Sequence, residues 1–233
     1  MPRALVTGAN RGIGLALTEA LLDRGWRVTA TCRKPDSASD LSALAERFQA
    51  RLDVESLDVE DFDAIGVLAE RMTGVTIDAL VNNAGVTHRD TRLGTLNYAA
   101  WRAVMEVNLL APMRMAEAFL EHVAASEQKK IVSISSGLGS IAATTGDNYF
   151  YRTSKAALNM AMRSVAMDLA PRGVIVAMLS PGYVDTDFTR GIMSGPPKIS
   201  VRDSGSGLAD AIEALKFEDA GVFKRFNGLV LSW

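Results

Sequence analysis

The hydrophobic positions of the chain form two alternating patterns. Short, almost continuously apolar runs predict strands of a parallel sheet, because such strands are buried on both faces. Longer segments carry apolar residues every three or four positions, which is the spacing of amphipathic helices. The strands are predicted at 4–7, 27–31, 79–82, 130–134 and 174–179, with weaker ones near 52–57 and 227–231, and the helices at 13–23, 40–49, 61–72, 98–121 and 150–169.

This alternation of strand and helix is typical of an α/β fold with a doubly wound (Rossmann) parallel sheet. We expect about seven strands with helices on both faces. The length of 233 residues suits a single domain spanning 1–233, since α/β chains of this size commonly stay undivided. Ligands of such sheets bind beyond the carboxyl ends of the strands, so the residues that follow each strand are the candidates for a site.

One segment breaks the alternation. Residues 189–207 read TRGIMSGPPKISVRDSGSG and are rich in Gly, Pro and Ser. This composition predicts irregular structure rather than a helix or a strand. We expect a mobile loop on the substrate side of the site, and not a linker to a second domain.

Composition and charge narrow the class of function. The chain is 48% apolar and 22% charged, with a formal net charge of −2. That balance is typical of a globular protein and gives no electrostatic reason to expect nucleic acid or an anionic membrane surface as partner. The sequence begins without an apolar signal segment, and no apolar run approaches a membrane span in length. We therefore expect a cytoplasmic protein with no nucleic acid or membrane partner.

Residue types that bind metals or act as nucleophiles are sparse. Cys32 is the single cysteine, which excludes an intramolecular disulfide and fits a reducing compartment. His88 and His122 have no second ligand at metal-binding spacing. We expect no metal site, and structural or surface roles for both histidines.

A glycine-rich turn follows the first predicted strand and opens the first helix. It reads TGANRGIG and contains Gly8, Gly12 and Gly14. Glycines permit tight dihedrals and close backbone approach, and a helix N-terminus offers free N–H groups to a pyrophosphate. The spacing differs from the commoner dinucleotide fingerprint, and a plain strand-to-helix turn is the alternative. The context nevertheless favours nucleotide binding.

The residues after the second strand favour NADP(H) over NAD(H). No acid stands there to hold the ribose hydroxyls of NAD, and Arg33 takes that place. Arg11 lies in the glycine-rich turn. Two guanidinium groups suit the 2′-phosphate of NADP, although both arginines could equally be solvated surface residues.

Together with motifs farther along, these features resemble the short-chain dehydrogenase/reductase family. The similar segments run through the whole chain in the family's order: TGANRGIG at 7–14, LDV at 57–59, NNAG at 82–85, Asn108, ISS at 134–136, the Y-x-x-x-K of Tyr151 and Lys155, and SPG at 180–182. SISSGLGSI and YRTSKAALN look most similar to the subgroup that contains C-factor and sniffer-type carbonyl reductases.

The resemblance implies a set of cofactor contacts. Asp58 and Val59 would flank the adenine, and Asn83 and Gly85 would support the adenosine ribose. Plainer alternatives are a helix cap for Asp58 or Thr186 and a turn former for Asn83. The full set of implied cofactor-binding residues is Gly8, Asn10, Arg11, Gly12, Ile13, Gly14, Arg33, Asp58, Val59, Asn83, Ala84, Gly85, Tyr151, Lys155, Pro181, Gly182, Val184 and Thr186.

Two tyrosines precede Lys155 in the segment NYFYRTSK. Tyr151 lies four residues before Lys155, so on a helix they share a face, whereas Tyr149 lies six residues before it and points away. Carbonyl reduction needs a proton donor, and a nearby ammonium lowers the pKa of a phenol from its ordinary ~10. Tyr151 is therefore predicted to be the acid, with Lys155 lowering its pKa. The resemblance adds that both hold the nicotinamide ribose, and Tyr149 is left as a pocket or packing residue.

Two further residues complete the predicted catalytic set. Ser136, at the end of the fifth strand, could hydrogen-bond the substrate oxygen, and the resemblance selects it over its neighbour Ser135. Asn108 is a polar residue inside an apolar helical segment. The resemblance implies that it distorts the helix and supports a proton route to Lys155, and the alternative is a satisfied buried amide.

The sequence thus predicts an NADP-dependent enzyme that reduces a ketone or aldehyde to an alcohol, with catalytic residues Asn108, Ser136, Tyr151 and Lys155. The resemblance implies use of the 4-pro-S hydride and a homodimer or homotetramer formed through helices 98–121 and 150–169. The alternatives are a dinucleotide-binding regulatory or signalling protein on the same fold, a steroid or acyl-thioester reductase, and an NAD-dependent alcohol dehydrogenase. The substrate itself is not encoded in a readable motif.

Overall fold

The computed structural model describes residues 1–88, 93–190 and 196–233. Its centre is a seven-stranded sheet with strand order β3-β2-β1-β4-β5-β6-β7, and every pairing between neighbouring strands is parallel. The order reverses between β1 and β4, which is the switch point where ligands bind in doubly wound folds. The predicted fold class is confirmed. The strands are β1 (Arg3–Thr7), β2 (Arg27–Cys32), β3 (Leu52–Ser56), β4 (Ala79–Asn82), β5 (Lys130–Ile134), β6 (Ile175–Ser180) and β7 (Phe223–Arg225).

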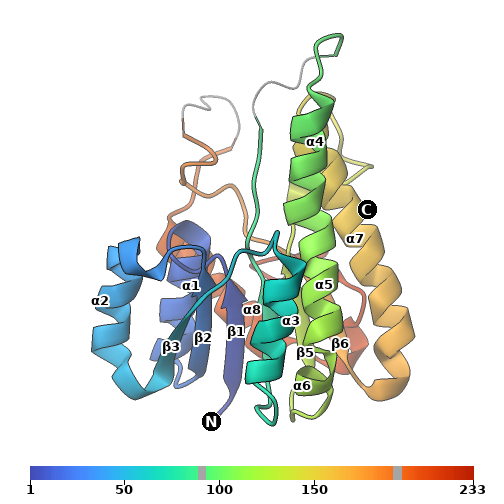
Figure 1. Ribbon diagram of the computed structural model, residues 1–233. Coiled ribbons are helices and arrows are strands. Elements are labelled where there is room, and N and C mark those ends of the chain that lie inside the picture. Colours follow the sequence, from blue (N-terminus) through green and yellow to red (C-terminus); the bar gives the residue numbers. More distant parts are fainter. Residues whose placement is uncertain (89–92, 191–195) are drawn as a thin grey trace.

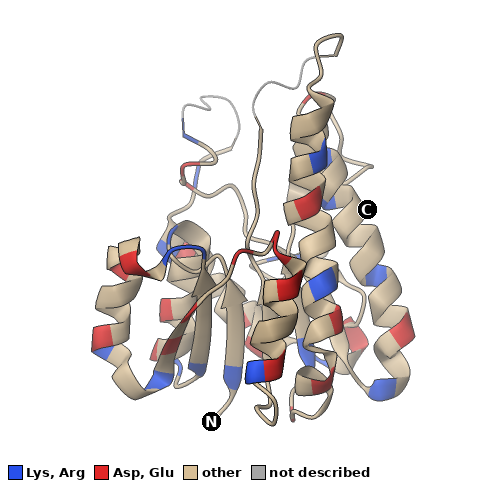
Figure 2. Cartoon of the chain, viewed as in Figure 1, with Lys and Arg blue, Asp and Glu red and all other residues tan. Residues whose placement is uncertain are grey.

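Helices cover both faces of the sheet (Figure 1). One face packs against α1 (Gly12–Asp23), α2 (Ser39–Phe48) and α8 (Val201–Ala214), whose leucines meet the apolar side chains of β1 and β2. The other packs against α3 (Phe62–Arg71), α5 (Ala111–Ala118) and α7 (Tyr149–Leu169). The central strands β1, β4, β5 and β6 are buried almost throughout because both faces are covered. In Figure 2 the strands are mostly tan, and the charged residues lie mainly on the helices and at strand ends.

The segment predicted as a helix over 98–121 is interrupted. It forms α4 (Tyr98–Met105), a single π-helical turn at Glu106–Leu110, α5, and then the short α6 (Leu120–Ala124). The π turn contains Asn108, the residue whose polarity was unexpected there. Turns of this kind inside α-helices are frequent at functional sites.

The prediction of irregular structure over 189–207 is wrong in its last part. Residues from Val201 onward belong to α8, whose N-cap residue Ser200 accepts the Asp203 N–H with its Oγ at 3.0 Å. The glycines that suggested a loop serve helix packing instead, since a Cβ on Gly205 would lie 2.6 Å from the backbone of Ala16 in α1. Residues 191–195 of the predicted loop lie outside the described residues.

The last strand is also displaced from its prediction. β7 is Phe223–Arg225, not 227–231. The chain turns back at Gly228, whose φ is +85°, and Leu231 N–H donates to Phe223 O at 2.8 Å. The apolar residues that suggested a strand, Leu229 and Val230, are largely exposed.

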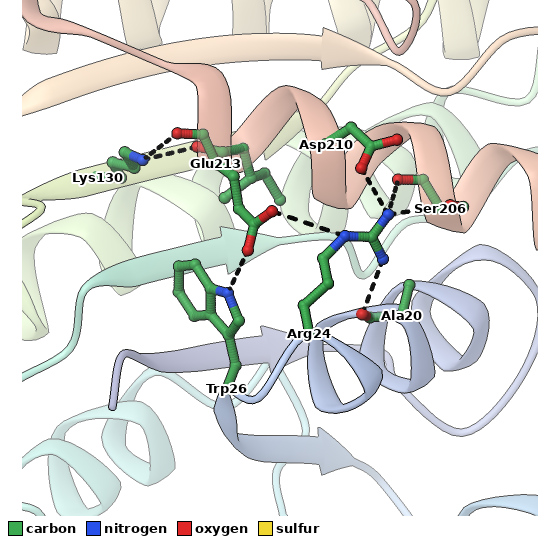
Figure 3. Close-up of polar contacts among 8 residues, drawn as sticks. Ala20, Arg24, Trp26, Lys130, Ser206, Asp210 and Glu213 are labelled. Atoms are coloured by element: carbon green, nitrogen blue, oxygen red, sulfur yellow. Dashed lines mark hydrogen bonds and ion pairs between the residues drawn. The ribbon is translucent and has the colours of Figure 1, made fainter.

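A polar network ties α8 to the amino ends of the strands, away from the site (Figure 3). Arg24 pairs with Asp210 at 2.6 Å, and Trp26 Nε1 donates to Glu213 at 2.8 Å. The buried ammonium of Lys130 donates to the carbonyls of Ile212 and Glu213 at 2.8 and 3.1 Å. These carbonyls lie at the end of α8, where a cation also complements the helix dipole. None of the described helices combines the length and the apolar character needed to span a membrane.

Candidate active site

The glycine-rich turn between β1 and α1 has the conformation that its sequence demands. Gly8 and Gly12 have φ values of +64° and +56°, which favour glycine. A Cβ on Gly14 would lie 2.3 Å from Gly8 O and 2.4 Å from Asn83 Nδ2. The turn is therefore too tight for any other residue at this position. Asn10 and Ile13 lie in the same stretch, and Ile13 packs on the core beneath it.

Residues after β4 fix this turn in place. Asn83 Nδ2 donates to Thr7 O at 2.8 Å and to Gly8 O at 3.1 Å. In return, Thr7 Oγ1 accepts the N–H groups of Asn83 and Ala84, both at 3.0 Å. Asn83 thus shapes the glycine-rich turn. Thr7 was missed by the sequence prediction, although its place directly before Gly8 was a usable signal.

The N-terminus of α1, the helix that follows the turn, has no side-chain cap. Arg11 is the N-cap residue of α1, and its side chain makes no capping hydrogen bond. Arg11 therefore leaves the N–H groups of the first turn of α1 without a capping side chain. This geometry and the absence of Cβ atoms at three positions fit the pyrophosphate of a dinucleotide.

The other implied cofactor residues lie along the carboxyl edge of the sheet. Arg33 is exposed directly after β2, and Val59, which follows Asp58, is buried. Asp58 accepts the Glu60 N–H at 3.2 Å, whereas the cap of α3 is Asp61. A shallow hollow lies here, lined by Asp58, Glu60, Asp61, Phe62 and Asp63. The acidic residues of this segment form the red stretch ahead of α3 in Figure 2.

The segment after β6 returns to the glycine-rich turn. Pro181 O accepts the Ser204 hydroxyl at 2.8 Å, and Gly182 has a φ of +88°. Val184 forms a parallel bridge with Ile199. Thr186 then reaches the turn, because a Cβ on Gly12 would lie 3.9 Å from its Cγ2. The segment after β6 thus lies beside the glycine-rich turn, although the two are far apart in sequence.

Tyr151 and Lys155 lie on α7 and face the carboxyl end of β5. Lys155 Nζ lies 5.7 Å from the centroid of the Tyr151 ring and donates to Ile134 O at 2.8 Å. Phe188, from the segment after β6, packs edge-on against the Tyr151 ring at 6.2 Å. Gly139 packs so closely on α7 that a Cβ would lie 2.9 Å from the Lys155 backbone.

The pKa values of this pair differ from the sequence expectation. Burial raises the pKa of Tyr151 to about 12, and a hydrogen bond with Ser136 partly opposes that rise. Burial also lowers the pKa of Lys155 to about 8. The expected net lowering of the tyrosine pKa is therefore absent in this structure, because desolvation of the phenolate dominates. A tyrosine with a raised pKa is protonated at neutral pH, the form required of an acid.

The two serines at the end of β5 face different ways. Ser135 is buried and its Oγ donates to Asn159 Oδ1 at 2.6 Å, inside the packing between β5 and α7. Ser136 is partly exposed, caps the short turn that follows by accepting the Leu138 N–H at 3.1 Å, and bonds to Tyr151. The alternation along the strand leaves Ser136 beside the tyrosine.

Asn108 connects three parts of the site. Its fully buried side chain accepts the Val86 N–H at 2.8 Å and donates to Val86 O and to Ser154 Oγ, both at 2.9 Å. A Cβ on Gly85 would lie 3.2 Å from Asn108 Oδ1 and 3.7 Å from Lys155 Nζ. The amide is thus satisfied, and it links Val86, which follows the NNAG segment, to Ser154 of α7. Ser154, which lies between Tyr151 and Lys155 in sequence, was not predicted.

The chain is similar to known proteins over most of its length. A family model described as short chain dehydrogenase matches residues 2–196. The chain is 35% identical over 236 residues to 1-hydroxy-2-glutathionyl-2-methyl-3-butene dehydrogenase from Rhodococcus sp. (strain AD45), with 100% of each chain covered.

Two solved structures are similar over the full chain. The carbonyl reductase Sniffer of D. melanogaster gives a TM-score of 0.92 at 31% identity, with 100% of both chains covered. An NADPH-bound carbonyl reductase from chicken fatty liver gives a TM-score of 0.92 at 32% identity, covering 100% of this chain and 99% of that one. The similarity to sniffer-type reductases that the sequence suggested is confirmed.

Proposed function

Since the chain belongs to the short chain dehydrogenase family, we propose that it is an NADPH-dependent reductase that converts a ketone or an aldehyde into an alcohol. The observation that carries the proposal is the gathering of Tyr151, Lys155 and Ser136 at the carboxyl end of β5. The glycine-rich turn, which fits a dinucleotide, opens at the same edge of the sheet.

The chain's own residues supply the proton and hold the substrate oxygen. NADPH, when bound, supplies the hydride that adds to the carbonyl carbon. Ser136 donates a hydrogen bond to the carbonyl oxygen and stabilises its developing negative charge. Tyr151 gives its phenolic proton to that oxygen, so the carbonyl gains one hydride and one proton and becomes the alcohol.

Lys155 stabilises the phenolate that Tyr151 becomes after proton transfer. With a pKa of about 8, its ammonium is mostly charged at neutral pH, and a positive charge stabilises the phenolate that remains after proton transfer. The π turn around Asn108 lies directly behind this lysine and is the proposed route by which the proton is replaced. The same groups acting in reverse would oxidise an alcohol.

The preference for NADPH rests on two arginines. Arg11 and Arg33 are both exposed and stand at the turn and directly after β2, where guanidinium groups would pair with the 2′-phosphate. The NADPH-bound carbonyl reductase from chicken, similar over the full chain, supports this preference.

We further propose a cytoplasmic homodimer or homotetramer formed through α4–α5 and α7. Large apolar residues are exposed on these helices, namely Tyr98, Met160 and Met167. Such exposed apolar residues are commonly covered when an interface forms.

A carbonyl panel tests the function. NADPH and NADH consumption is followed with aliphatic and aromatic ketones and aldehydes, and Tyr151→Phe is compared with the matched control Tyr149→Phe. We expect NADPH to be the better cofactor, and turnover to fall by about 10³-fold in Tyr151→Phe but by less than about threefold in Tyr149→Phe. Undiminished turnover of Tyr151→Phe would remove the mechanism, and faster consumption of NADH would instead support an NAD-dependent alcohol dehydrogenase.

A further inference from the structure

Arg11 is paired with a carboxylate that is remote in sequence. Its Nη1 donates to Asp187 Oδ2 at 2.7 Å, which links the glycine-rich turn to the segment after β6. In the strand order, β2 lies on one side of β1 and β6 lies on the other. Arg33 follows β2, so Arg33 and Asp187 approach the turn from opposite flanks.

Asp187 is presented by an ordered turn. Thr189 Oγ1 donates to Val184 O at 2.6 Å, and Thr189 N–H donates to Thr186 O at 3.0 Å. Lys198 Nζ donates to Thr189 O at 2.8 Å, which also stabilises the turn. The carboxylate therefore stands at a fixed place beside the glycine-rich turn.

We propose that Asp187 is a cofactor-specificity residue that competes with the 2′-phosphate of NADPH for Arg11. The inference rests on the proposed function, which assigns Arg11 and Arg33 to that phosphate. Because Arg33 and Asp187 lie on opposite flanks of the turn, Arg11 must leave Asp187 to join Arg33 on the phosphate. Asp187 thereby reduces the advantage of NADPH over NADH.

A second cation at the carboxylate makes the exchange easy. Arg190 also pairs with Asp187, at 2.5 Å, so the carboxylate keeps a partner when Arg11 leaves. The Arg11 and Asp187 side chains are 64% and 48% exposed. An ion pair with this exposure shifts a competing equilibrium only modestly, by up to about fivefold.

The experiment measures binding rather than turnover. Dissociation constants for NADPH, NADH, 2′,5′-ADP and 5′-AMP are determined by calorimetry for the wild type and for Asp187→Asn. Asp185→Asn is the matched control, because Asp185 is also an exposed carboxylate of this segment but pairs with Lys198 instead. Both aspartate variants are repeated in an Arg11→Gln background.

The competition predicts that Asp187→Asn tightens NADPH and 2′,5′-ADP by about two- to fivefold and leaves NADH and 5′-AMP within about 1.5-fold. The gain should disappear in the Arg11→Gln background and be absent in Asp185→Asn. Equal tightening of phosphorylated and unphosphorylated ligands, or an equal effect of Asp185→Asn, would overturn it as a general charge effect. Weaker binding of both cofactors in Asp187→Asn would also overturn it and would indicate a clasp over the cofactor. If the wild type bound NADPH no better than NADH, both the proposed cofactor preference and this inference would fail. If the wild type preferred NADPH and Asp187→Asn changed nothing, only this inference would fail.

Discussion

A buried lysine side chain lies at each end of strand β5, and the two lysines have different surroundings. Lys130 begins the strand, and Lys155 reaches from α7 to the carbonyl of Ile134, which ends it. Each is only 4% exposed, and burial lowers the pKa of both. Position, partners and neighbouring charges then distinguish them.

Lys130 is surrounded by acceptors and opposite charge. Its ammonium donates to Gln128 Oε1, Ile212 O and Glu213 O, at 2.8, 2.8 and 3.1 Å. The carboxylates of Glu213 and Asp78 oppose the lowering of its pKa. A buried charge with these partners stabilises one arrangement of α8 on the sheet and has no donor left for a ligand.

Lys155 is less completely satisfied. Among the described residues its ammonium has one hydrogen-bond acceptor, the Ile134 carbonyl, and burial alone accounts for its pKa of about 8. An ammonium carries three donors, so two remain for ligands. Burial of a lysine alone therefore does not indicate a functional site, whereas burial with unused hydrogen-bonding capacity beside a tyrosine makes Lys155 a candidate for one.

The largest effect that separates the two lysines is on activity. Lys155→Met should lower kcat/KM by about 10³-fold, equivalent to ~4 kcal/mol, because the phenolate of Tyr151 loses its nearby cation. Its stability should change by less than about 1 kcal/mol, since an incompletely paired buried charge is removed together with one hydrogen bond. Steady-state kinetics and urea unfolding measure the two quantities. A folded Lys155→Met variant with normal kcat/KM would contradict a catalytic role for Lys155.

Lys130→Met should show the opposite behaviour. Two helix-end carbonyls and two carboxylates lose their cation, so we expect a loss of about 3 kcal/mol in the free energy of unfolding. Turnover per folded molecule should stay within about twofold, because the residue lies at the end of β5 remote from Tyr151. Urea unfolding at neutral pH and assay of the folded enzyme provide the measurement. A fall in total activity larger than the fall in the folded fraction would contradict the assignment of Lys130 to stability alone.

A smaller effect appears in the pH dependence of stability. The pKa of Lys155 falls from the ordinary 10.5 to about 8 on folding, so between these values the unfolded chain binds more protons than the folded one. Stability should therefore rise with pH across this window, by about 2 kcal/mol between about pH 7.5 and about pH 9.5 from this residue. Unfolding titrations of the wild type and Lys155→Met at both pH values isolate the contribution of Lys155 to this pH dependence, because Lys130 contributes equally in both proteins. The same rise in both proteins would show that Lys155 has an ordinary pKa.

The sequence was a good guide where local pattern and packing agree. Buried strands such as 79–82 and 130–134 were predicted with their observed bounds, because continuous apolar runs have few alternatives in an α/β chain. The start of α8 was not predictable, because Gly205 looks like a loop residue until Ala16 is placed against it. Close approach of two helices is a tertiary property that overrides local propensity.

The site shows the same division. The spacing of Tyr151 and Lys155 indicated a shared helix face, and the structure has them 5.7 Å apart as ring centroid and Nζ. The direction of the tyrosine's pKa shift was not predictable, because it depends on how much water the surrounding segments exclude. Asp187 likewise gave no signal, since its partner Arg11 is remote in sequence.

The most direct test of the central claim follows the hydride itself. A ketone that is turned over by the enzyme is reduced with (4S)-[4-²H]NADPH, and the alcohol is analysed by mass spectrometry for the wild type and for Tyr151→Phe. The account predicts that the wild type places one deuterium on the former carbonyl carbon and that Tyr151→Phe forms almost no labelled alcohol in the same time. Unlabelled alcohol from the wild type, or equal labelling by Tyr151→Phe, would contradict it.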